Sequence, residues 1–378
     1  MNMWKTTTLG LMIAGLAGCN LGGGSSGDSS GEPQTQDEDI AGYESLQAKL
    51  EGTREVFLKG PAQDFATAKD TLFWVEAAVG DPLLHSYDAA TKQTTNYGFK
   101  VYLTGPNSPN PTDNINYFAS TSLIASMNEL DGANTYAVGS EKSALGKLTL
   151  PAPPYGQKWW SYGVDGNNVY VTIINMDDAK YHVQRWAPGD AAPTDVAILD
   201  DLIAPNVMGE FHNFAVSGET LIFDEGDRIW LAKLSDAKAK WAKNDKRVNG
   251  VDFYDGGAVY SQNTEFWRYD MATDTRENLS DKMRSGYTLN KTFAQAHHPA
   301  GSSTWCKRGN TIVYEASSGI FSYDLTAATV KPLLLSARDN SVVYKYPTAL
   351  ENGTLFVKGL ESKSGSIGAD GPTYTLAP

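Results

Sequence analysis

The chain has 378 residues, with 44 Asp and Glu against 31 Lys and Arg, and a formal net charge of −13. Proteins that bind nucleic acids or acidic lipid surfaces do so through basic patches, so this balance argues against both partners. The 19 Tyr, 13 Phe and 9 Trp, together with 36 Gly, favour many strands joined by tight turns.

The N-terminus has the features of an export signal. Lys5 precedes a short apolar run, Leu9 to Gly18, which is shorter than the about 20 residues that span a bilayer. The segment LAGC, which ends at Cys19, resembles the lipobox of bacterial lipoproteins. This resemblance implies that residues 1–18 are a signal peptide and that Cys19 is lipidated with a diacylglycerol and a further acyl chain such as palmitate. The alternative is an ordinary signal peptide with an incidental Cys19.

The residue after the cysteine is Asn20 rather than an Asp that would retain a lipoprotein in the inner membrane. The resemblance therefore implies a lipid anchor in the bacterial outer membrane, and leaves open whether the protein faces the periplasm or the cell surface. Residues 19–40 are rich in Gly and Ser, then acidic, and hold no Lys or Arg. Such a composition is typical of a flexible tether, so the folded domain is expected at 41–378.

The folded part contains an internal repeat. Its clearest copies are Asp70–Tyr97, Gly256–Ser280 and Gly309–Leu335. Each has a β-rich run, a short turn, a second run that ends in Tyr-Asp, a Thr-rich turn and a third run. Alternating apolar residues would bury one face of each strand, and the Asp side chain can accept hydrogen bonds from the turn that follows it. Each unit is thus expected to be a small antiparallel sheet.

Weaker copies complete the series: Asn134–Pro151, Asn168–Leu199, Gly218–Ala242, where Ala232 and Lys233 replace Tyr-Asp, and Asn352–Pro378. The copies recur about every 48 residues, which is the length of one four-stranded blade of a β-propeller. We therefore predict an all-β propeller of seven blades. Six or eight blades, and a pair of β-sandwiches, are the alternatives.

Two segments lie outside the repeats. The run Arg54–Gly60 precedes the first unit and could supply the outer strand that the truncated last unit lacks, which would close the ring. The insertion Leu103–Ser122 is dense in Pro and Asn and indicates a long loop above one face. The strand-turn units, such as IFSYDLTAAT, resemble those of TolB-like and related propellers, which implies the same fold.

Motifs for catalysis are absent. The sequence has no HExxH or CxxCH pattern and no GxSxG nucleophile elbow, and it predicts no cofactor, no metal and no catalytic residue. If Cys19 is acylated, Cys306 is the single remaining thiol, which excludes an intramolecular disulfide and a cysteine-based zinc site.

Five residues are candidates for binding: Trp159, Trp160, His212, His297 and His298. Two adjacent Trp in an extended segment cannot both face one core, so one could stack on a sugar or anchor a protein. The His297–His298 pair falls in the longest connection between two repeats, where loops on a rigid scaffold often carry function. The alternative for both histidines is a solvated loop, and His212 is equally ambiguous.

The sequence favours a membrane-anchored envelope lipoprotein whose propeller is a non-catalytic scaffold that binds an unknown protein or polysaccharide. The runner-up is a propeller-type polysaccharide lyase or glycosidase, because such sites draw single residues from several blades and leave no local motif. An assembly or electron-transfer accessory is a third reading. Turnover of a polysaccharide would distinguish the second reading from the first.

Overall fold

The computed structural model of the chain describes most of the region after residue 35. The described ranges are 36–60, 62–76, 83–100, 115–128, 132–139, 144–148, 161–175, 180–199, 211–218, 220–225, 228–234, 239–243, 248–262, 265–285, 305–316, 318–339, 341–363, 366–367 and 371–376. Cys19 lies outside them, as do Trp159, Trp160, His297 and His298.

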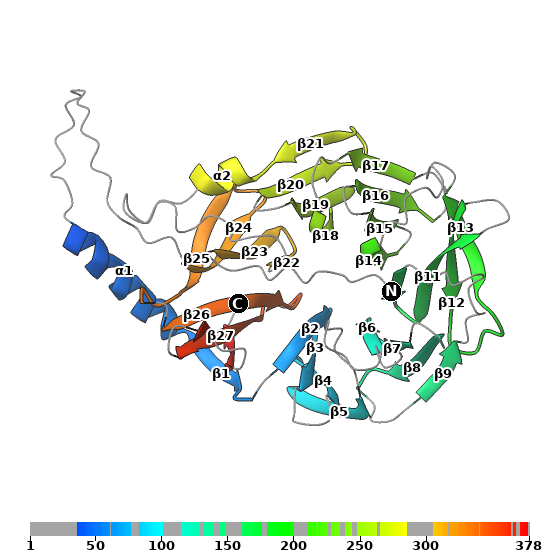
Figure 1. Cartoon of the computed structure of the whole chain (residues 1–378), viewed down its shortest axis with the longest axis horizontal. Coiled ribbons are helices and arrows are strands. Elements are labelled where there is room, and N and C mark those ends of the chain that lie inside the picture. The colour runs from blue at the N-terminus through cyan, green and yellow to red at the C-terminus, as the bar shows by residue number, and fades with distance from the viewer. Residues whose placement is uncertain are drawn as a thin grey trace, which may run out of the picture.

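The protein is a seven-bladed β-propeller. Seven antiparallel sheets follow one another along the chain, and Figure 1 shows them arranged in a ring around a central axis. The prediction of seven four-stranded blades is therefore confirmed. Six sheets are simple meanders in chain order, so the first strand of each blade is the inner one and the fourth is the outer one.

Blades 1 to 3 come from the first half of the chain. Blade 1 consists of β2 (Ala62–Ala68), β3 (Thr71–Glu76), β4 (Leu83–Asp88) and β5 (Gln93–Lys100). Blade 2 consists of β6 (Ile115–Ala119), β7 (Leu123–Asn128), β8 (Gly132–Ala137) and β9 (Ala144–Leu148). Blade 3 consists of β10 (Ser161–Asp165), β11 (Asn168–Asn175), β12 (Lys180–Trp186) and β13 (Thr194–Leu199).

Blades 4 to 6 continue the pattern. Blade 4 consists of β14 (Phe211–Ser217), β15 (Thr220–Glu225), β16 (Arg228–Lys233) and β17 (Ala239–Lys243). Blade 5 consists of β18 (Val248–Tyr254), β19 (Gly257–Gln262), β20 (Glu265–Asp270) and β21 (Thr275–Asn278), followed by the short helix α2 (Ser280–Ser285). Blade 6 consists of β22 (Trp305–Arg308), β23 (Thr311–Ala316), β24 (Gly319–Asp324) and β25 (Thr329–Leu335).

Blade 7 joins the two ends of the folded chain. Its strands lie in the order β26 (Val342–Ala349), β27 (Leu355–Lys363), β29 (Thr373–Leu376) and β1 (Arg54–Leu58), and the two-residue strand β28 (Ser366–Ile367) pairs with β27. The N-terminal strand β1 thus pairs antiparallel with the C-terminal strand β29. The expectation that Arg54–Gly60 closes the ring is confirmed.

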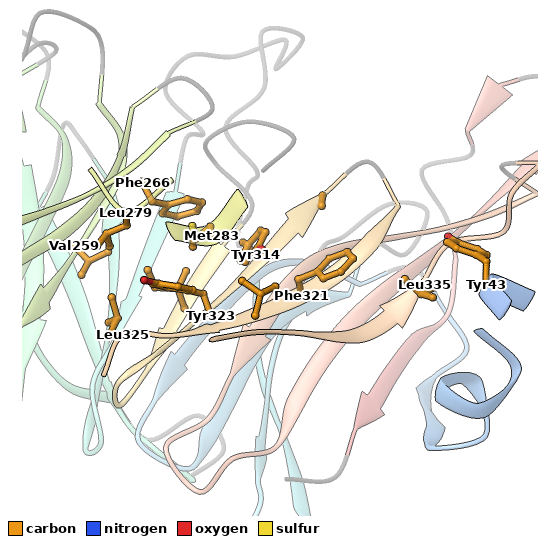
Figure 2. Close-up of a cluster of buried hydrophobic side chains, with 13 residues drawn as sticks. Tyr43, Val259, Phe266, Leu279, Met283, Tyr314, Phe321, Tyr323, Leu325 and Leu335 are labelled. Carbon is orange, nitrogen blue, oxygen red and sulfur yellow. The ribbon is translucent and has the colours of Figure 1, made fainter. Parts of the chain in front are cut away.

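The cores lie between neighbouring blades. Figure 2 shows the largest of these clusters, in which Val259 and Phe266 of blade 5 lie beside Tyr314 and Tyr323 of blade 6. Gly250 on β18 shows how closely the blades approach, because a Cβ there would lie 2.9 Å from the indole nitrogen of Trp305 in blade 6. The blades therefore stabilise one another by burying aromatic and aliphatic side chains.

The helix α1 (Gln36–Glu51) lies outside the ring, against blades 6 and 7 (Figure 1). Its buried Tyr43 donates a hydrogen bond to the Ser336 carbonyl at 2.9 Å, while Glu51 accepts one from the Tyr344 hydroxyl at 3.0 Å. The helix begins at Gln36, within the last residues assigned to the tether. Its one buried face fixes the start of the folded chain to the blade that closes the ring.

The prediction of a loop over Leu103–Ser122 is wrong at its C-terminal end. The segment Ile115–Ala119 is the strand β6, which pairs antiparallel with β7 along its whole length. Its sequence, INYFA, carries the Ile, Tyr and Phe that favour strands. The density of Pro and Asn in the preceding residues concealed this local preference.

Candidate functional site

Of the five predicted binding residues, the structure describes the position of His212 alone. Trp159, Trp160, His297 and His298 lie outside the described residues, and so does the lipidation candidate Cys19. His212 lies on the inner strand β14, between Phe211 and Phe214, where the register with β15 shifts. These candidates remain predictions.

Two further histidines, His85 and His182, are buried within sheets. His85 on β4 stacks on Trp74 and lies 3.1 Å from a Glu76 carboxylate oxygen, and His182 on β12 lies 3.0 Å from Asp195. Burial lowers the pKa of the His85 imidazole, and Glu76 acts in the opposite direction. Both histidines serve the packing of their blades.

One face of the ring is built from tight turns. In a four-stranded meander, the turns that join strands one to two and three to four lie at the same edge, and we call the surface they form the hairpin-turn face. In blades 1, 5 and 6, the turn between the third and fourth strands is stabilised by the same hydrogen bonds. The carboxylates of Asp88, Asp270 and Asp324 each accept two backbone N–H groups of the turn at 2.7–2.9 Å. The Tyr-Asp pattern predicted these hydrogen bonds, and they lower the pKa of all three carboxyl groups.

The hairpin-turn face contains a cleft that spans blades 4, 5 and 6, with a volume of about 730 Å³. Such a volume is within the usual range for ligand sites. We call it the blade 4–6 cleft. Its lining residues are Ser217, Thr220, Lys233, Phe253, Tyr254, Asp255, Gly256, Gly257, Met271, Ala272, Lys307, Gly309 and Asn310.

The middle of the cleft is the β18–β19 hairpin of blade 5. Its two turn residues, Asp255 and Gly256, both have positive φ, of 42° and 75°. This is the conformation of a two-residue hairpin turn that twists with its strands. The next residue is Gly257, where a Cβ would lie 1.9 Å from the Tyr269 carbonyl oxygen. The sequence DGG therefore lets this hairpin bend sharply and lie against the neighbouring strand.

Hydrogen bonds to neighbouring blades hold both walls of the cleft. On the blade 4 side, the Gly218 N–H donates to an Asp165 carboxylate oxygen of blade 3 at 3.0 Å. On the blade 6 side, the Arg308 guanidinium donates to the Gly353 carbonyl of blade 7 at 2.8 Å. Within blade 6, the Leu325 N–H donates to the Asn310 carbonyl at 2.8 Å. The cleft is thus formed before any ligand arrives, which lowers the entropic cost of binding.

A carboxyl group and a thiol lie beside the cleft, on the inner strands β18 and β22. Burial raises the pKa of the Asp252 carboxyl, while Lys307 and the Phe253 N–H, 2.7 Å from Oδ1, act in the opposite direction. Burial also raises the pKa of the Cys306 thiol, to about 12. The thiol is therefore protonated at neutral pH, as expected of a structural cysteine rather than a nucleophile.

Sequence reasoning missed the charged residues of this cleft. Lys233 had a signal, because it stands where the repeat pattern loses its Tyr-Asp pair. Lys307 follows Cys306 in a segment where only the thiol attracted attention, and Asp252 carried no signal. Among the described residues, no group of three His, Cys, Asp or Glu side chains is arranged to hold a metal ion. Within the same ranges, no helix is long and apolar enough to cross a membrane.

Comparison with known proteins supports the fold. No protein-family model matches the sequence, and no protein of curated function matches it either. Similar solved structures include a chain of the mitotic checkpoint complex, with 10% identity over 97% of this chain and 100% of that chain and a TM-score of 0.51. An oligogalacturonate lyase in complex with manganese has 10% identity over 86% and 97%, and a TM-score of 0.51.

A further oligogalacturonate lyase, from Vibrio parahaemolyticus, has 9% identity over 86% of this chain and 97% of its own, and a TM-score of 0.50. At such identities the likeness shows a shared propeller and nothing finer. The comparisons do not single out the TolB-like family. They include both a chain of a protein complex and two oligogalacturonate lyases, so the choice between binding and catalysis depends on the site itself.

Proposed function

We propose that the protein is a scaffold lipoprotein of the bacterial outer membrane, anchored through Cys19, whose propeller binds a partner protein on its hairpin-turn face. The observation that carries this proposal is the blade 4–6 cleft, whose walls are fixed by hydrogen bonds to blades 3 and 7. A rigid cleft built from the turns of three blades suits recognition, because little order has to be gained on binding.

Crosslinking in intact envelopes tests the binding surface. A photoreactive residue is placed at Ala272, which lines the cleft, or at Ala90, the same turn position in blade 1. Both residues are exposed, and both donate their N–H groups to the preceding Asp, so the two variants are structurally matched. We expect a discrete crosslinked partner from the Ala272 position alone. Equal crosslinking at both positions, or none at either, would contradict the proposal.

The anchor is tested separately. Replacing Cys19→Ala is expected to release the protein from the membrane fraction and to abolish labelling with an alkyne analogue of palmitate. If the variant stays in the membrane and the wild-type chain takes up no label, the anchoring part of the proposal fails. The binding part would be unaffected, because it rests on the folded domain.

The alternative function is cleavage of an envelope polysaccharide. Asp252 is the observation that favours it, because burial raises the pKa of its carboxyl and a raised pKa is a property of general acids. Under this alternative, the purified protein would depolymerise a glycan and Asp252→Asn would abolish the activity. Under the scaffold proposal, Asp252→Asn leaves partner crosslinking at Ala272 intact.

A further inference from the structure

We propose that the blade 4–6 cleft recognises an acidic peptide segment, with carboxylates at the two ends and an apolar side chain between them. This inference rests on the proposed function, and it specifies the chemistry of the partner that the cleft accepts. Its basis is the arrangement of two lysines, an apolar patch and an exposed turn carboxylate around one hairpin.

The two lysines come from opposite walls of the cleft. Lys233 ends β16 of blade 4, and Lys307 lies on β22 of blade 6, with the blade 5 hairpin between them. Among the described residues, no hydrogen bond or ion pair engages the Lys233 ammonium. Lys307 donates to the Gly309 carbonyl, at 3.4 Å, and its charge also acts on the Asp252 carboxyl beside the cleft. Two lysines on one cleft stand out in a chain of net charge −13. They can attract anions at both ends of a bound segment.

The apolar patch lies between these cations. Phe253, Met271 and Ala272, all from blade 5, line the cleft. Met and Phe side chains accommodate aliphatic groups of varied shape, as expected for the apolar residue of a peptide. The patch therefore sets the second requirement for the ligand, after its charge.

An acidic sugar is the competing ligand, because sugars stack on aromatic rings and both Phe253 and Tyr254 line the cleft. The guanidinium of Arg268 lies over the Tyr254 ring, 6.0 Å from its centroid, and takes up one face of that ring. The test below therefore includes an acidic oligosaccharide beside the peptide.

Asp255 supplies a group for the peptide backbone. It is exposed at the tip of the β18–β19 turn, so its carboxylate can accept a hydrogen bond from a backbone N–H of the bound segment. The same carboxylate repels a chain that is acidic at every position. The cleft therefore favours acidic groups separated by at least one neutral residue.

Binding of a labelled peptide to the full-length protein tests the inference. The probe is the fluorescein-labelled octapeptide Ser-Glu-Asp-Leu-Met-Glu-Asp-Ser, measured by fluorescence anisotropy at low and high salt. We expect saturable binding that weakens with salt, because charge pairs near a surface are screened. The double variant Lys233→Gln/Lys307→Gln should bind about tenfold or more weakly, which corresponds to about 1.4 kcal/mol.

Three controls keep the test decisive. Lys331→Gln removes an exposed cation from the outer strand β25, away from the cleft, and should leave binding unchanged. The pair Lys233→Arg/Lys307→Arg keeps both charges and should bind within about threefold of wild type, a difference of about 0.7 kcal/mol. If the double Gln variant unfolds, the two single Gln variants, each expected to weaken binding, replace it.

The outcomes separate this inference from the proposed function. A control octapeptide has every Glu and Asp replaced with Gln and Asn, and the acidic-peptide inference is overturned if it binds as tightly as the acidic one. The inference is also overturned if trigalacturonate binds in a manner that depends on the two lysines and the acidic peptide does not bind. A partner that crosslinks at Ala272 but does not depend on Lys233 or Lys307 also overturns it, while the scaffold proposal survives. If the wild-type cleft gives no crosslinked partner at Ala272, both the acidic-peptide inference and the scaffold proposal are contradicted.

Discussion

Single residues at the junction of blades 5 and 6 have protonation states that burial controls. Cys306 and Asp252 lie on adjacent inner strands, and for both groups desolvation is the main cause of a raised pKa. The neighbouring carboxyl also adds to the rise in the Cys306 pKa. The protein therefore keeps a proton on this thiol well above neutral pH.

The raised pKa of Cys306 makes stability depend on alkaline pH. Below the ordinary thiol pKa of about 8.5, the thiol is protonated in both states and its contribution to folding is complete. As the pH rises toward the folded pKa of about 12, the unfolded chain loses the proton first, so stability falls. Between pH 8.5 and 11, we expect the free energy of unfolding to fall more steeply for the wild-type thiol than for Cys306→Ala.

Urea denaturation at a series of pH values measures this difference, with Cys19→Ala in both proteins so that one thiol is compared. The buried tyrosines titrate equally in the two proteins, so they cancel in the comparison. Parallel pH profiles would contradict the proposed burial of the Cys306 thiol.

At the scale of elements, the turn after each Tyr-Asp pair is a repeated device. Its fourth residue has positive φ in blades 1, 5 and 6: 56° at Lys92, 54° at Asp274 and 52° at Ala328. L-residues with a Cβ are strained in this conformation, whereas glycine adopts it freely. The Asp carboxylate stabilises the turn by accepting two backbone N–H groups at its start.

Relief of this strain should stabilise the protein. Ala328→Gly is expected to raise the free energy of unfolding by about 0.5–1 kcal/mol, because the strain removed exceeds the added entropy of the unfolded chain. Ala327→Gly is the matched control. Ala327 itself does not have a positive φ, so replacing it with Gly should destabilise the protein by about 0.5–1 kcal/mol. Chemical denaturation gives both values, and a change of the same sign in both variants would refute the assignment of strain to Ala328.

The sequence predicted best the blades that contain this turn, because the Tyr and the Asp that accepts the turn's hydrogen bonds can both be recognised in the local sequence. Blade 4 was a weaker match, since Lys233 occupies the position of the Asp. The strand β6 and the helix α1 were missed for different reasons. The Pro and Asn residues before β6 concealed its preference for a strand, although its partner β7 follows directly. The helix α1 depends on partners far along the chain, in blades 6 and 7, and carries no turn motif.

The candidate cleft was beyond the reach of sequence reasoning at the scale of the whole molecule. Lys233, Asp255 and Lys307 belong to three successive blades, and the packing of these blades side by side brings them to one surface. Histidine and tryptophan attracted attention because their chemistry is recognisable without a fold. Lysines in strands do not stand out in this way, although the structure places two of them on opposite walls of one cleft.

Closure of the ring rests on a single strand of the N-terminal segment. Strand β1 pairs with β29, and Arg54 on β1 lies over the Tyr374 ring, 4.4 Å from its centroid. The same Arg54 lies 3.5 Å from Glu51 at the end of α1. Helix, strand and C-terminal strand therefore form one joint that holds blade 7 together.

Removal of β1 should open this joint. A chain that starts at residue 59 is expected to melt at a lower temperature than one that starts at residue 36 and to self-associate, because the edge of β29 is exposed. A chain that starts at residue 52 keeps β1 and lacks α1, and should stay monomeric. Calorimetry and light scattering measure both effects, and addition of a peptide of residues 36–58 should restore the monomer. Equal melting temperatures for the chains starting at 36 and 59 would refute this role of the joint.

The pairing of β1 with β29 also sets an order on biogenesis. Strand β1 is translated before every other strand of the ring and β29 after all of them, so the ring stays open until β29 has emerged from the ribosome. Until then six sheets can form while blade 7 has an unpaired edge. Under the export that we propose, the chain could therefore cross the membrane before the ring closes, and β29 would complete the fold on the far side.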